Sequence, residues 1–488
     1  MSKFIYKSAL ELAKLIREGS ATSVEIVKEH LEQIHKHNGQ INALISVFEE
    51  EALAEAAACD TEAKAGNFRG PLHGVPITIK EQFWIKGKAS NTNSKILKDF
   101  VAPSDAVVIE RIKKAGCIIL GQSNVPRNLT DYQVHGDIYP VGKNPFNPEY
   151  SPGGSTGGGA ASLAAGFSPL ELGGDFGGSI RVPANFCGLY GLKPTENTVP
   201  LHGNIPLAKN SNTFLVHMAQ AGPMARNMYD LESLWKVIAG PHESDRNIAD
   251  IKWEHPKDKP LNAYRVAWTD SWPGYGCSSA IRNAIESLIK GLQSDGCNTT
   301  KDIPKNDLHK RSLQTYMGIF PYVIAQSTPW IVREIIKMQL NSGVFKGLKN
   351  DAPEFAREMN KAFKMNVHHY ASMMLQRSLI TQEWELFFKD YDFMICPVAF
   401  GPSYKRCKTG SKIQYDGKEM VYLNYVWPYV ACFNASGNPT LSIPLGIGPD
   451  GLPLGIQIVG KYWSEPELIA FGKKVASITS GFIKPEGY

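Results

Sequence analysis

The sequence has no long apolar segment, no dense cluster of cysteines and no large excess of charge. None of its apolar runs approaches the ~20 residues that a membrane-spanning helix needs, and its charged first residues lack the apolar core of a secretory signal. The eight cysteines form no C-x-x-C pair and no disulfide framework of the kind found in small secreted domains. We therefore expect free thiols, a cytoplasmic protein and no membrane partner.

The charge balance argues against nucleic acid as a partner. Lys and Arg number 52 against 47 Asp and Glu, which leaves a formal charge of +5 without long basic runs. Hydrophobic residues make up 43% of the chain and charged residues 20%, as in ordinary folded proteins. The composition thus predicts a globular protein whose function must be sought in its motifs.

The order of apolar segments divides the chain into three regions. Residues 1–70 are predicted to form helices, because Ser8 with Glu11 and Thr22 with Glu25 have the spacing of capping boxes. Short apolar runs alternate with helical segments over 71–305 and 389–488, a pattern typical of α/β folds, and an aromatic-rich helical insertion covers roughly 306–388. Since no linker or repeat separates these regions, one domain over 1–488 is predicted.

The most informative stretch is SPGGSTGGGAASLAAGFSPLELGGDFGGSIRVPANFCGLYGLKPT, residues 151–195. Its two Gly-Gly-Ser elements, 153–155 and 177–179, flank a small-residue helix and a short strand, so these glycines end ordered elements and do not form a linker. Glycines let successive N–H groups converge into a nest for an anion. An amide hydrolase needs such a nest for the carbonyl oxygen, which becomes negative during attack. The predicted donors are the backbone N–H groups of Phe176, Gly177, Gly178 and Ser179.

Lys80, at the end of the apolar run GVPITIK, is the candidate base. A serine hydroxyl is a poor nucleophile until a base removes its proton. The pKa of a solvated lysine is near ~10.4, so a neutral amine near pH 7 requires burial that lowers the pKa by roughly 3 units. A single lysine at a strand end is usually a surface residue. The presence of the two Gly-Gly-Ser loops in the same sequence is what favours a catalytic role for Lys80.

These segments resemble the amidase signature family. GVPITIKE, SPGGSTGGG and GGDFGGSIRVPANFCGLYGLKPT are similar to its lysine strand, first serine loop and nucleophile loop, in the same order, and the similarity covers nearly the whole chain. The resemblance implies a Ser-Ser-Lys triad with Ser179 as nucleophile, Ser155 as bridging serine after a cis peptide bond, and Lys80 as base. It also implies an ion pair of Asp175 with Arg181 that braces the nucleophile loop, and a single-domain α/β/α sandwich with a large twisted mixed β-sheet covered by helices on both faces. No metal or cofactor is expected.

Three positions depart from the family pattern. Thr156 stands where a second serine is usual, Glu81 where aspartate is usual, and Gly174 where threonine is common. None of them is one of the three catalytic residues. The departures therefore concern only the hydrogen bonds around the site.

Other motifs are explained by ordinary structure. Residues 446–451 match a dinucleotide fingerprint but run into another strand, so a hairpin turn is predicted, and residues 455–461 match a P-loop whose interior has the pattern of a strand. The adjacent His368 and His369 cannot share one helical face as metal ligands do. Cys187 has no nearby histidine in the sequence and is predicted to be a buried small side chain.

Aromatic residues of the insertion are candidates for the acyl or amine pocket, with ordinary core packing an equally good explanation. They are Tyr316, Phe320, Tyr322 and Trp330.

The leading functional hypothesis is a free-standing amidase that cleaves the C–N bond of a small carboxamide. A second is the glutaminase subunit of a tRNA-dependent amidotransferase, although residues 196–227 do not resemble the usual continuation of that subunit. A third is a catalytically silent binding protein with the same fold, because a fold alone does not prove a function. The expected partner is a small-molecule amide, with the choice of amide and a homodimer left open.

Overall fold

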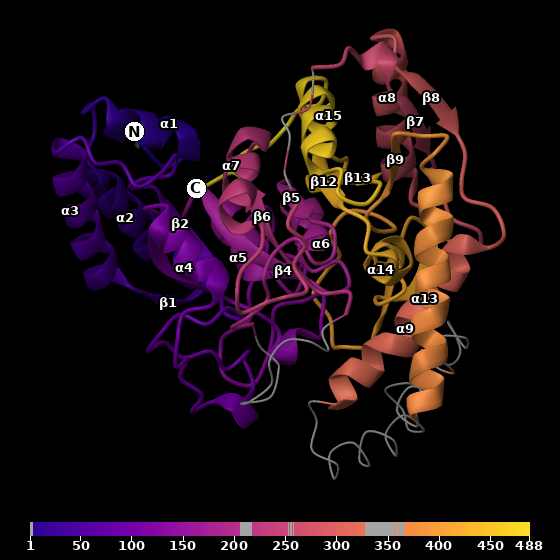
Figure 1. Cartoon of the computed structure of the whole chain (residues 1–488), viewed down its shortest axis with the longest axis horizontal. Coiled ribbons are helices and arrows are strands. Elements are labelled where there is room, and N and C mark those ends of the chain that lie inside the picture. The colour runs from indigo at the N-terminus through magenta and orange to yellow at the C-terminus, as the bar shows by residue number, and fades with distance from the viewer. Residues whose placement is uncertain are drawn as a thin grey trace.

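The computed structural model describes residues 3–204, 217–251, 253, 256, 258–326, 357, 361 and 366–488. Within them, eleven strands form one sheet in the spatial order β1-β3-β2-β4-β6-β5-β12-β13-β9-β7-β8 (Figure 1). These strands are β1 Leu44–Val47, β2 Pro76–Lys80, β3 Ile118–Ser123, β4 Leu170–Asp175, β5 Tyr190–Lys193, β6 Gln220–Ala225, β7 Arg265–Trp268, β8 Asn298–Lys301, β9 Phe393–Pro397, β12 Thr440–Ile447 and β13 Pro453–Gly460. A separate hairpin consists of β10 Lys412–Tyr415 and β11 Lys418–Val421.

The sheet is mixed, as the sequence predicts. β2 is parallel to both β3 and β4, and β7 is parallel to both β8 and β9, whereas the remaining neighbours are antiparallel. The parallel group β3-β2-β4 therefore brings three carboxyl ends to one edge of the sheet, where functional groups gather in α/β proteins.

Helices of six residues or more account for much of the remaining described chain. They are α1 Ala9–Arg17, α2 Ser23–Ile41, α3 Glu49–Lys64, α4 Val107–Lys114, α5 Gly157–Ala164, α6 Arg181–Phe186, α7 Met228–Ile238, α8 Ser279–Ser294, α9 Leu308–Gln326, α13 Val367–Phe387, α14 Trp427–Ser436 and α15 Glu465–Ser477. The predicted capping boxes are confirmed, because Ser8 and Thr22 accept the N–H groups of Glu11 and Glu25 while those glutamates bond back.

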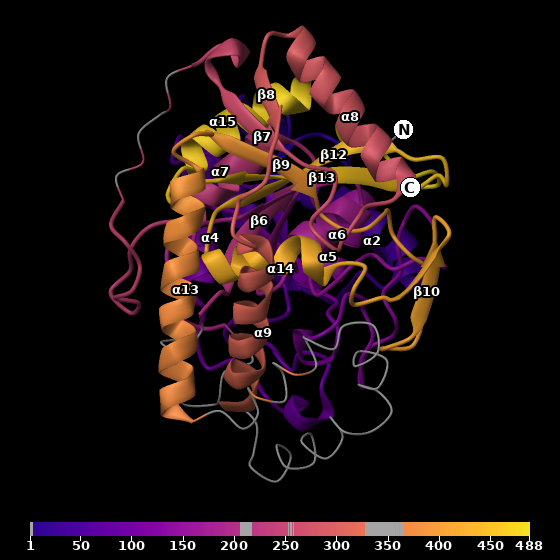
Figure 2. The same cartoon turned by 90° about the vertical axis from the view of Figure 1, so that its right-hand side faces the viewer.

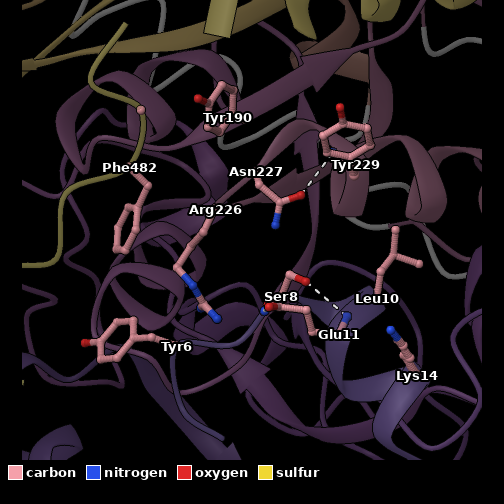
Figure 3. Close-up of a pocket in the computed structure, with 11 residues that line it drawn as sticks. Tyr6, Ser8, Leu10, Glu11, Lys14, Tyr190, Arg226, Asn227, Tyr229 and Phe482 are labelled. Carbon is pink, nitrogen blue, oxygen red and sulfur yellow. Dashed lines mark hydrogen bonds between the residues drawn. The ribbon is translucent and has the colours of Figure 1, made fainter. Parts of the chain in front are cut away.

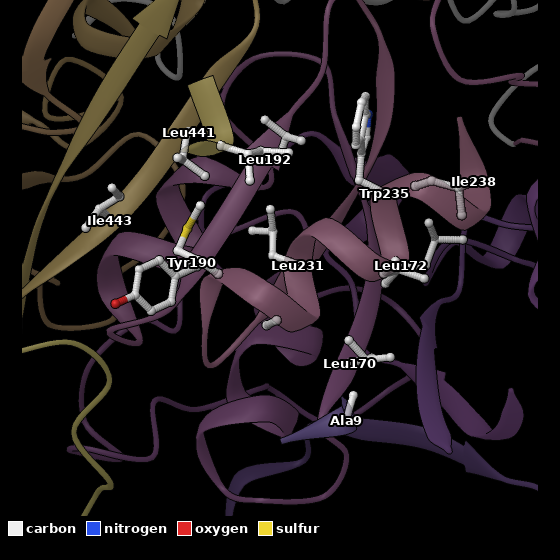
Figure 4. Packing of buried hydrophobic residues seen from close by; sticks show 14 of the residues in the cluster. Ala9, Leu170, Leu172, Tyr190, Leu192, Leu231, Trp235, Ile238, Leu441 and Ile443 are labelled. Carbon is white, nitrogen blue, oxygen red and sulfur yellow. The ribbon is translucent and has the colours of Figure 1, made fainter. Parts of the chain in front are cut away.

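Helices cover both faces of the sheet. One apolar cluster joins α1, α4, α7, α8 and α15 to one face, and part of it, around Leu172, Leu192 and Leu231, is drawn in Figure 4. On the other face lie α5, α6 and α14, with α9 and α13 packed beside α14. Figure 2 shows β9, β12 and β13 between α8 and α15 on one side and α14 and α9 on the other. The predicted α/β/α sandwich with a large mixed sheet is therefore confirmed.

Some local predictions can be checked directly. Residues 448–452 connect the antiparallel strands β12 and β13, so the hairpin turn predicted over 446–451 is confirmed, and residues 455–460 lie inside β13 as expected. The ends of the insertion are helical in α9 and α13, whereas residues 327–356 and Trp330 among them lie outside the described residues. The domain boundaries remain a prediction.

One central strand has no counterpart in the sequence-based prediction. β6, with the sequence QAGPMA, lies between β4 and β5 although it follows both in the chain. Pro223 of β6 pairs opposite Leu172. Proline and glycine are uncommon in central strands, so local propensity does not indicate a strand here.

None of the described helices combines the length and the apolar character that crossing a membrane requires.

Candidate active site

The candidate site lies at the carboxyl ends of the parallel strands β2, β3 and β4. Lys80 ends β2 and pairs in register with Ser123, which ends β3. Asp175 ends β4, the parallel neighbour of β2 on its other side. The two Gly-Gly-Ser loops meet at this edge, because the Thr156 N–H donates to the Ser179 carbonyl at 3.2 Å.

Lys80 has the environment that the sequence-based argument requires. The side chain is 1% exposed, and its Nζ lies 2.7 Å from Ser155 Oγ and 3.1 Å from the Gly174 carbonyl oxygen. Burial lowers the pKa of Lys80 to about 7, although the charges of Asp175 and Glu171 act in the opposite direction. A large share of these amines is therefore neutral near pH 7 and can accept a proton.

Ser155 follows a cis peptide bond from Gly154, as the resemblance implies. It lies two residues before α5, a helix whose residues are all buried. A helix beginning at this point directs its positive dipole end toward the serine loop. Glycine is needed at 154, because a Cβ there would come within 2.2 Å of the Asp131 carbonyl oxygen.

Ser179 lies two residues before α6 and keeps 8% of its surface exposed. No hydrogen bond from its hydroxyl to another described residue is present, so the Ser179 hydroxyl does not contact Ser155 at hydrogen-bonding distance. The structure thus joins Lys80 to Ser155 and leaves the Ser179 hydroxyl without a partner in the described chain.

The four predicted N–H donors differ in availability. The Gly178 N–H donates to Asp175 Oδ1 at 2.8 Å and is already engaged. The N–H groups of Phe176, Gly177 and Ser179 have no acceptor among the described residues. Gly178 has a φ of +101°, a conformation that favours glycine.

Asp175 and Arg181 form a fully buried ion pair beneath the nucleophile loop. Arg181 Nη2 lies 3.0 Å from Asp175 Oδ1, and both side chains are 0% exposed. Burial alone would raise the pKa of the Asp175 carboxyl, but the Arg181 charge and hydrogen bonds from Arg181 and Asn434 lower it well below its usual range. Arg181 also donates to the Val430 carbonyl at 3.0 Å and to Gln457 at 3.1 Å, which anchors the loop to α14 and β13.

The three departures from the family pattern have local explanations. A Cβ at Gly174 would lie 2.5 Å from Gln82 Nε2, so a larger residue there would require the Gln82 side chain to move. The Thr156 hydroxyl donates to the Gly174 carbonyl oxygen at 3.3 Å. The buried Glu81 carboxylate accepts the Asn91 N–H at 2.6 Å, and burial raises the pKa of Glu81 to about 8.

Aromatic side chains from α9 cover the nucleophile loop. Phe320 packs on Phe176 with ring centroids 4.9 Å apart and stacks on Tyr316 at 5.2 Å. Trp427 at the start of α14 contacts both α9 rings. Tyr322 instead stacks on Tyr370 at 4.8 Å.

Two groups at the site were missed by the sequence analysis. The Tyr132 hydroxyl donates to the Gly177 carbonyl, a contact that no local motif signals. Glu171 of β4 is fully buried and accepts the Ser123 hydroxyl at 2.6 Å. Burial raises the pKa of Glu171 to about 7, while the Ser123 hydrogen bond and the Lys80 charge oppose this shift.

A cavity away from the candidate site, drawn in Figure 3, lies near α1 and the start of α7. Arg226, which lines this cavity, comes directly after the last residue of β6. Gln220, at the other end of β6, pairs with Asp175 of the candidate site, so the cavity and the site lie at opposite ends of this strand. The Arg226 guanidinium donates to four backbone carbonyls, those of Ile5, Lys7, Leu163 and Ser168. Because none of the predicted site residues lines this cavity, it is not a candidate active site.

One group of side chains has the composition of a metal site. In the described ranges, Cys59, Glu62 and His73 place ligand atoms within 4.8 Å of one another. The Glu62 carboxylate is already paired with the Arg69 guanidinium, and His73 Nδ1 accepts the backbone N–H of Arg69 at 3.3 Å. The oxygen and nitrogen ligands are therefore engaged. Cys187 is fully buried, and burial raises the pKa of its thiol, which agrees with its interpretation as a small core residue.

With this geometry established, the chain was compared with known proteins. A family model described as Amidase matches residues 25–469. The chain belongs to the amidase (amidase signature) family. It is accordingly an amide hydrolase acting on carbon–nitrogen bonds, and the resemblance seen in the sequence is confirmed.

Individual relatives of this amidase match nearly its whole length. It is 33% identical to the A subunit of the glutamyl-tRNA(Gln) amidotransferase of Thiobacillus denitrificans (strain ATCC 25259 / T1), over 96% of both chains. The corresponding protein of Clostridium botulinum (strain Eklund 17B / Type B) is 30% identical, over 95% of this chain and 96% of the relative. The crystal structure of a bacterial aryl acylamidase superposes with a TM-score of 0.82 at 22% identity, covering 97% of this chain and 96% of that one. That likeness shows the shared fold.

Proposed function

We propose that this amidase hydrolyses a small carboxamide through an acyl-enzyme on Ser179, with Ser155 and Lys80 as its proton relay. The observation that carries the proposal is the buried Lys80 amine, 2.7 Å from Ser155 Oγ. A neutral amine at this distance accepts the Ser155 proton through its lone pair while an N–H still donates to the Gly174 carbonyl.

The first step forms a bond between Ser179 Oγ and the amide carbon. Ser155 accepts the Ser179 proton as it passes its own to Lys80, so the hydroxyl becomes a nucleophile without a free alkoxide. The C–N bond then breaks, and the leaving ammonia or amine takes a proton back along the same path. Water repeats the relay and releases the carboxylic acid.

The developing oxyanion is stabilised by backbone donors. The N–H groups of Phe176, Gly177 and Ser179, which have no acceptor in the described part of the chain, are the donors in this proposal, and the Gly178 N–H serves the Asp175 brace. Removing a single oxyanion donor in studied hydrolases costs roughly 3 to 4 kcal/mol. Fixing the loop through Asp175 and Arg181 keeps these donors aligned before the substrate binds.

The partner in this proposal is a small-molecule amide. The rings of Phe176, Phe320 and Trp427 make an aromatic wall over the nucleophile loop, which suits an uncharged acyl or amine group. All eight cysteines are free thiols, which supports a reducing compartment, and we infer a cytoplasmic location.

A second candidate function is the glutaminase step of a tRNA-dependent amidotransferase. It is favoured by the relatives at 30% and 33% identity, which are named as A subunits of glutamyl-tRNA(Gln) amidotransferases. Such a protein should need its partner subunits for full activity, whereas a free-standing amidase should cleave amides alone. The purified chain is therefore offered glutamine and a panel of neutral amides, esters and ureas, with release of amine or ammonia as the readout.

Covalent labelling tests the nucleophile. We expect a fluorophosphonate to label the wild-type protein stoichiometrically at Ser179 and to leave Ser179→Ala unlabelled, with turnover lost and the thermal midpoint retained. Unlabelled but folded wild-type protein would support the third hypothesis, a silent binding protein. Amide hydrolysis at an unchanged rate by Ser179→Ala would reject the proposed nucleophile.

A further inference from the structure

The peptide that joins Gly177 to Gly178 is held at both ends. Its carbonyl oxygen accepts the Tyr132 hydroxyl, and its N–H donates to Asp175 Oδ1 at 2.8 Å. In a trans peptide these two groups point in opposite directions. The two hydrogen bonds therefore prevent the plane of this peptide from rotating about the line between the two Cα atoms.

The following part of the loop is fixed in the same manner. The Gly178 carbonyl accepts the Val182 N–H at 2.8 Å, and the Ser179 carbonyl accepts the Thr156 N–H at 3.2 Å. From the Gly177 carbonyl to the Ser179 carbonyl, every backbone carbonyl and N–H thus has a partner, except the Ser179 N–H, which has none among the described residues. Because adjacent peptides share a Cα atom, releasing the Gly177 carbonyl would change the aim of the N–H groups on either side of that peptide.

Tyr132 contacts both serine loops. Its backbone packs against Gly154, where an added Cβ would lie 2.9 Å from the Tyr132 Cα, and its hydroxyl reaches Gly177. The Tyr132 carbonyl accepts the Ser151 hydroxyl at 2.8 Å and the Tyr404 hydroxyl at 3.2 Å. The side chain is 5% exposed, and burial raises its pKa well above the usual value, so it stays a donor.

We propose that Tyr132 is a positioning residue that aligns the oxyanion donors of the nucleophile loop through its hydrogen bond to the Gly177 carbonyl. It does so without contacting the reacting atoms itself. This inference rests on the proposed function, since it assigns Tyr132 a part in the same nucleophile loop.

The test measures fluorophosphonate labelling of wild type, Tyr132→Phe, Tyr425→Phe and Ser179→Ala over a range of probe concentrations. Tyr425→Phe is the matched control, because its equally buried hydroxyl donates at 2.9 Å to the Pro402 carbonyl, outside the serine loops. For Tyr132→Phe we expect the maximal labelling rate to fall about tenfold, less than the ~10²-fold loss typical of a missing oxyanion donor. The probe concentration at half-maximal rate should stay unchanged, and Tyr425→Phe should match wild type.

The labelling amplitude and the labelling rate answer different questions. The amplitude counts the folded molecules, so partial misfolding of Tyr132→Phe lowers the amplitude and leaves the rate constant interpretable. A wild-type rate in Tyr132→Phe, with Ser179→Ala unlabelled, would overturn the role of Tyr132 and leave the proposed function standing. An equal fall in both Tyr→Phe variants would also overturn it, in favour of a general packing effect. Absence of wild-type labelling would reject the proposed function itself.

Discussion

Two buried lysines end strands of the same sheet, β2 and β5, and the side chains differ in the atoms that their amines face. Lys80 ends β2 and Lys193 ends β5, and their exposed fractions are 1% and 0%. Burial lowers the pKa of both amines to about 7. Lys80 Nζ meets a serine hydroxyl at 2.7 Å, whereas Lys193 Nζ donates to the Pro194 carbonyl at 3.0 Å.

The comparison separates two requirements of a lysine base. Burial alone supplies a neutral amine, and within the described residues it does so at both of these lysines. Only at Lys80 does that amine face a group with a proton to give. A perturbed pKa is therefore a weak sign of catalysis until the neighbouring atoms are known.

The largest effect is expected from removing each amine in turn. Lys80→Met should lower turnover by at least about 10³-fold, since members of a catalytic triad act as a unit. Lys193→Met should stay within about threefold of wild type, because its amine faces no hydroxyl. Initial rates of amine release from a neutral amide measure both variants. Comparable losses in the two variants, with folding retained, would erase the distinction between these lysines.

Ser155→Ala should make the surroundings of Lys80 resemble those of Lys193. The Lys80 amine would then face only the Gly174 carbonyl, and the path to Ser179 would be broken. A general acid–base contribution of ~10² to 10⁴ should be lost from kcat, with the thermal midpoint little changed. An unchanged kcat in Ser155→Ala would mean that proton transfer to Lys80 does not require Ser155. Thr156→Ala, one residue away, is the matched control.

The dependence of kcat/KM on pH should reflect the titration of Lys80 and should not change when Lys193 is replaced. The base works in its neutral form, so kcat/KM should fall about tenfold per pH unit as the pH drops below about 7 and level off above it. Rates measured from acid to mild alkali in wild type and Lys193→Met should share one midpoint. A shifted midpoint in Lys193→Met would mean that Lys193, and not Lys80 alone, determines the pH dependence.

The smallest expected effect concerns stability. The pKa of each lysine is about 7 in the folded protein and near ~10.4 in the unfolded chain, so between these values the unfolded state binds more protons. The free energy of unfolding should therefore gain about 1.4 kcal/mol per pH unit per lysine as the pH rises through this window. Urea denaturation at a series of pH values measures this dependence. In Lys193→Met, the free energy of unfolding should rise less steeply with pH, by that amount. An unchanged slope would mean that Lys193 keeps an ordinary pKa in the fold.

The positions of the candidate site residues could be predicted because they sit in short, ordered motifs, whereas their catalytic roles remain a proposal. Lys80, Ser155 and Ser179 lie at strand ends or in glycine loops, where local sequence restricts the backbone, and the capping boxes at Ser8 and Thr22 are equally local. The hairpin between β12 and β13 follows from adjacent turn residues. Short-range chemistry was sufficient in each case.

What could not be predicted depends on contacts between distant segments. Tyr132 lies 45 residues before the glycine whose carbonyl it binds. The engagement of the Gly178 N–H by Asp175 depends on the dihedral angles of the loop, including the φ of +101° at Gly178. The strand β6, despite Pro223, is held by its place between β4 and β5 and not by its own propensity. Tertiary structure decides these features.

The full burial of Asp175 and Arg181 has a consequence for how the enzyme responds to its surroundings. Their charges cancel beneath the loop, out of reach of mobile ions, and the groups proposed to react are neutral in their working forms. Salt screens the interactions between exposed charges, with a screening length of about 10 Å at 0.1 M. Buried charges are screened much less. The rate of hydrolysis of an uncharged amide should therefore be nearly the same at low and at high salt concentration.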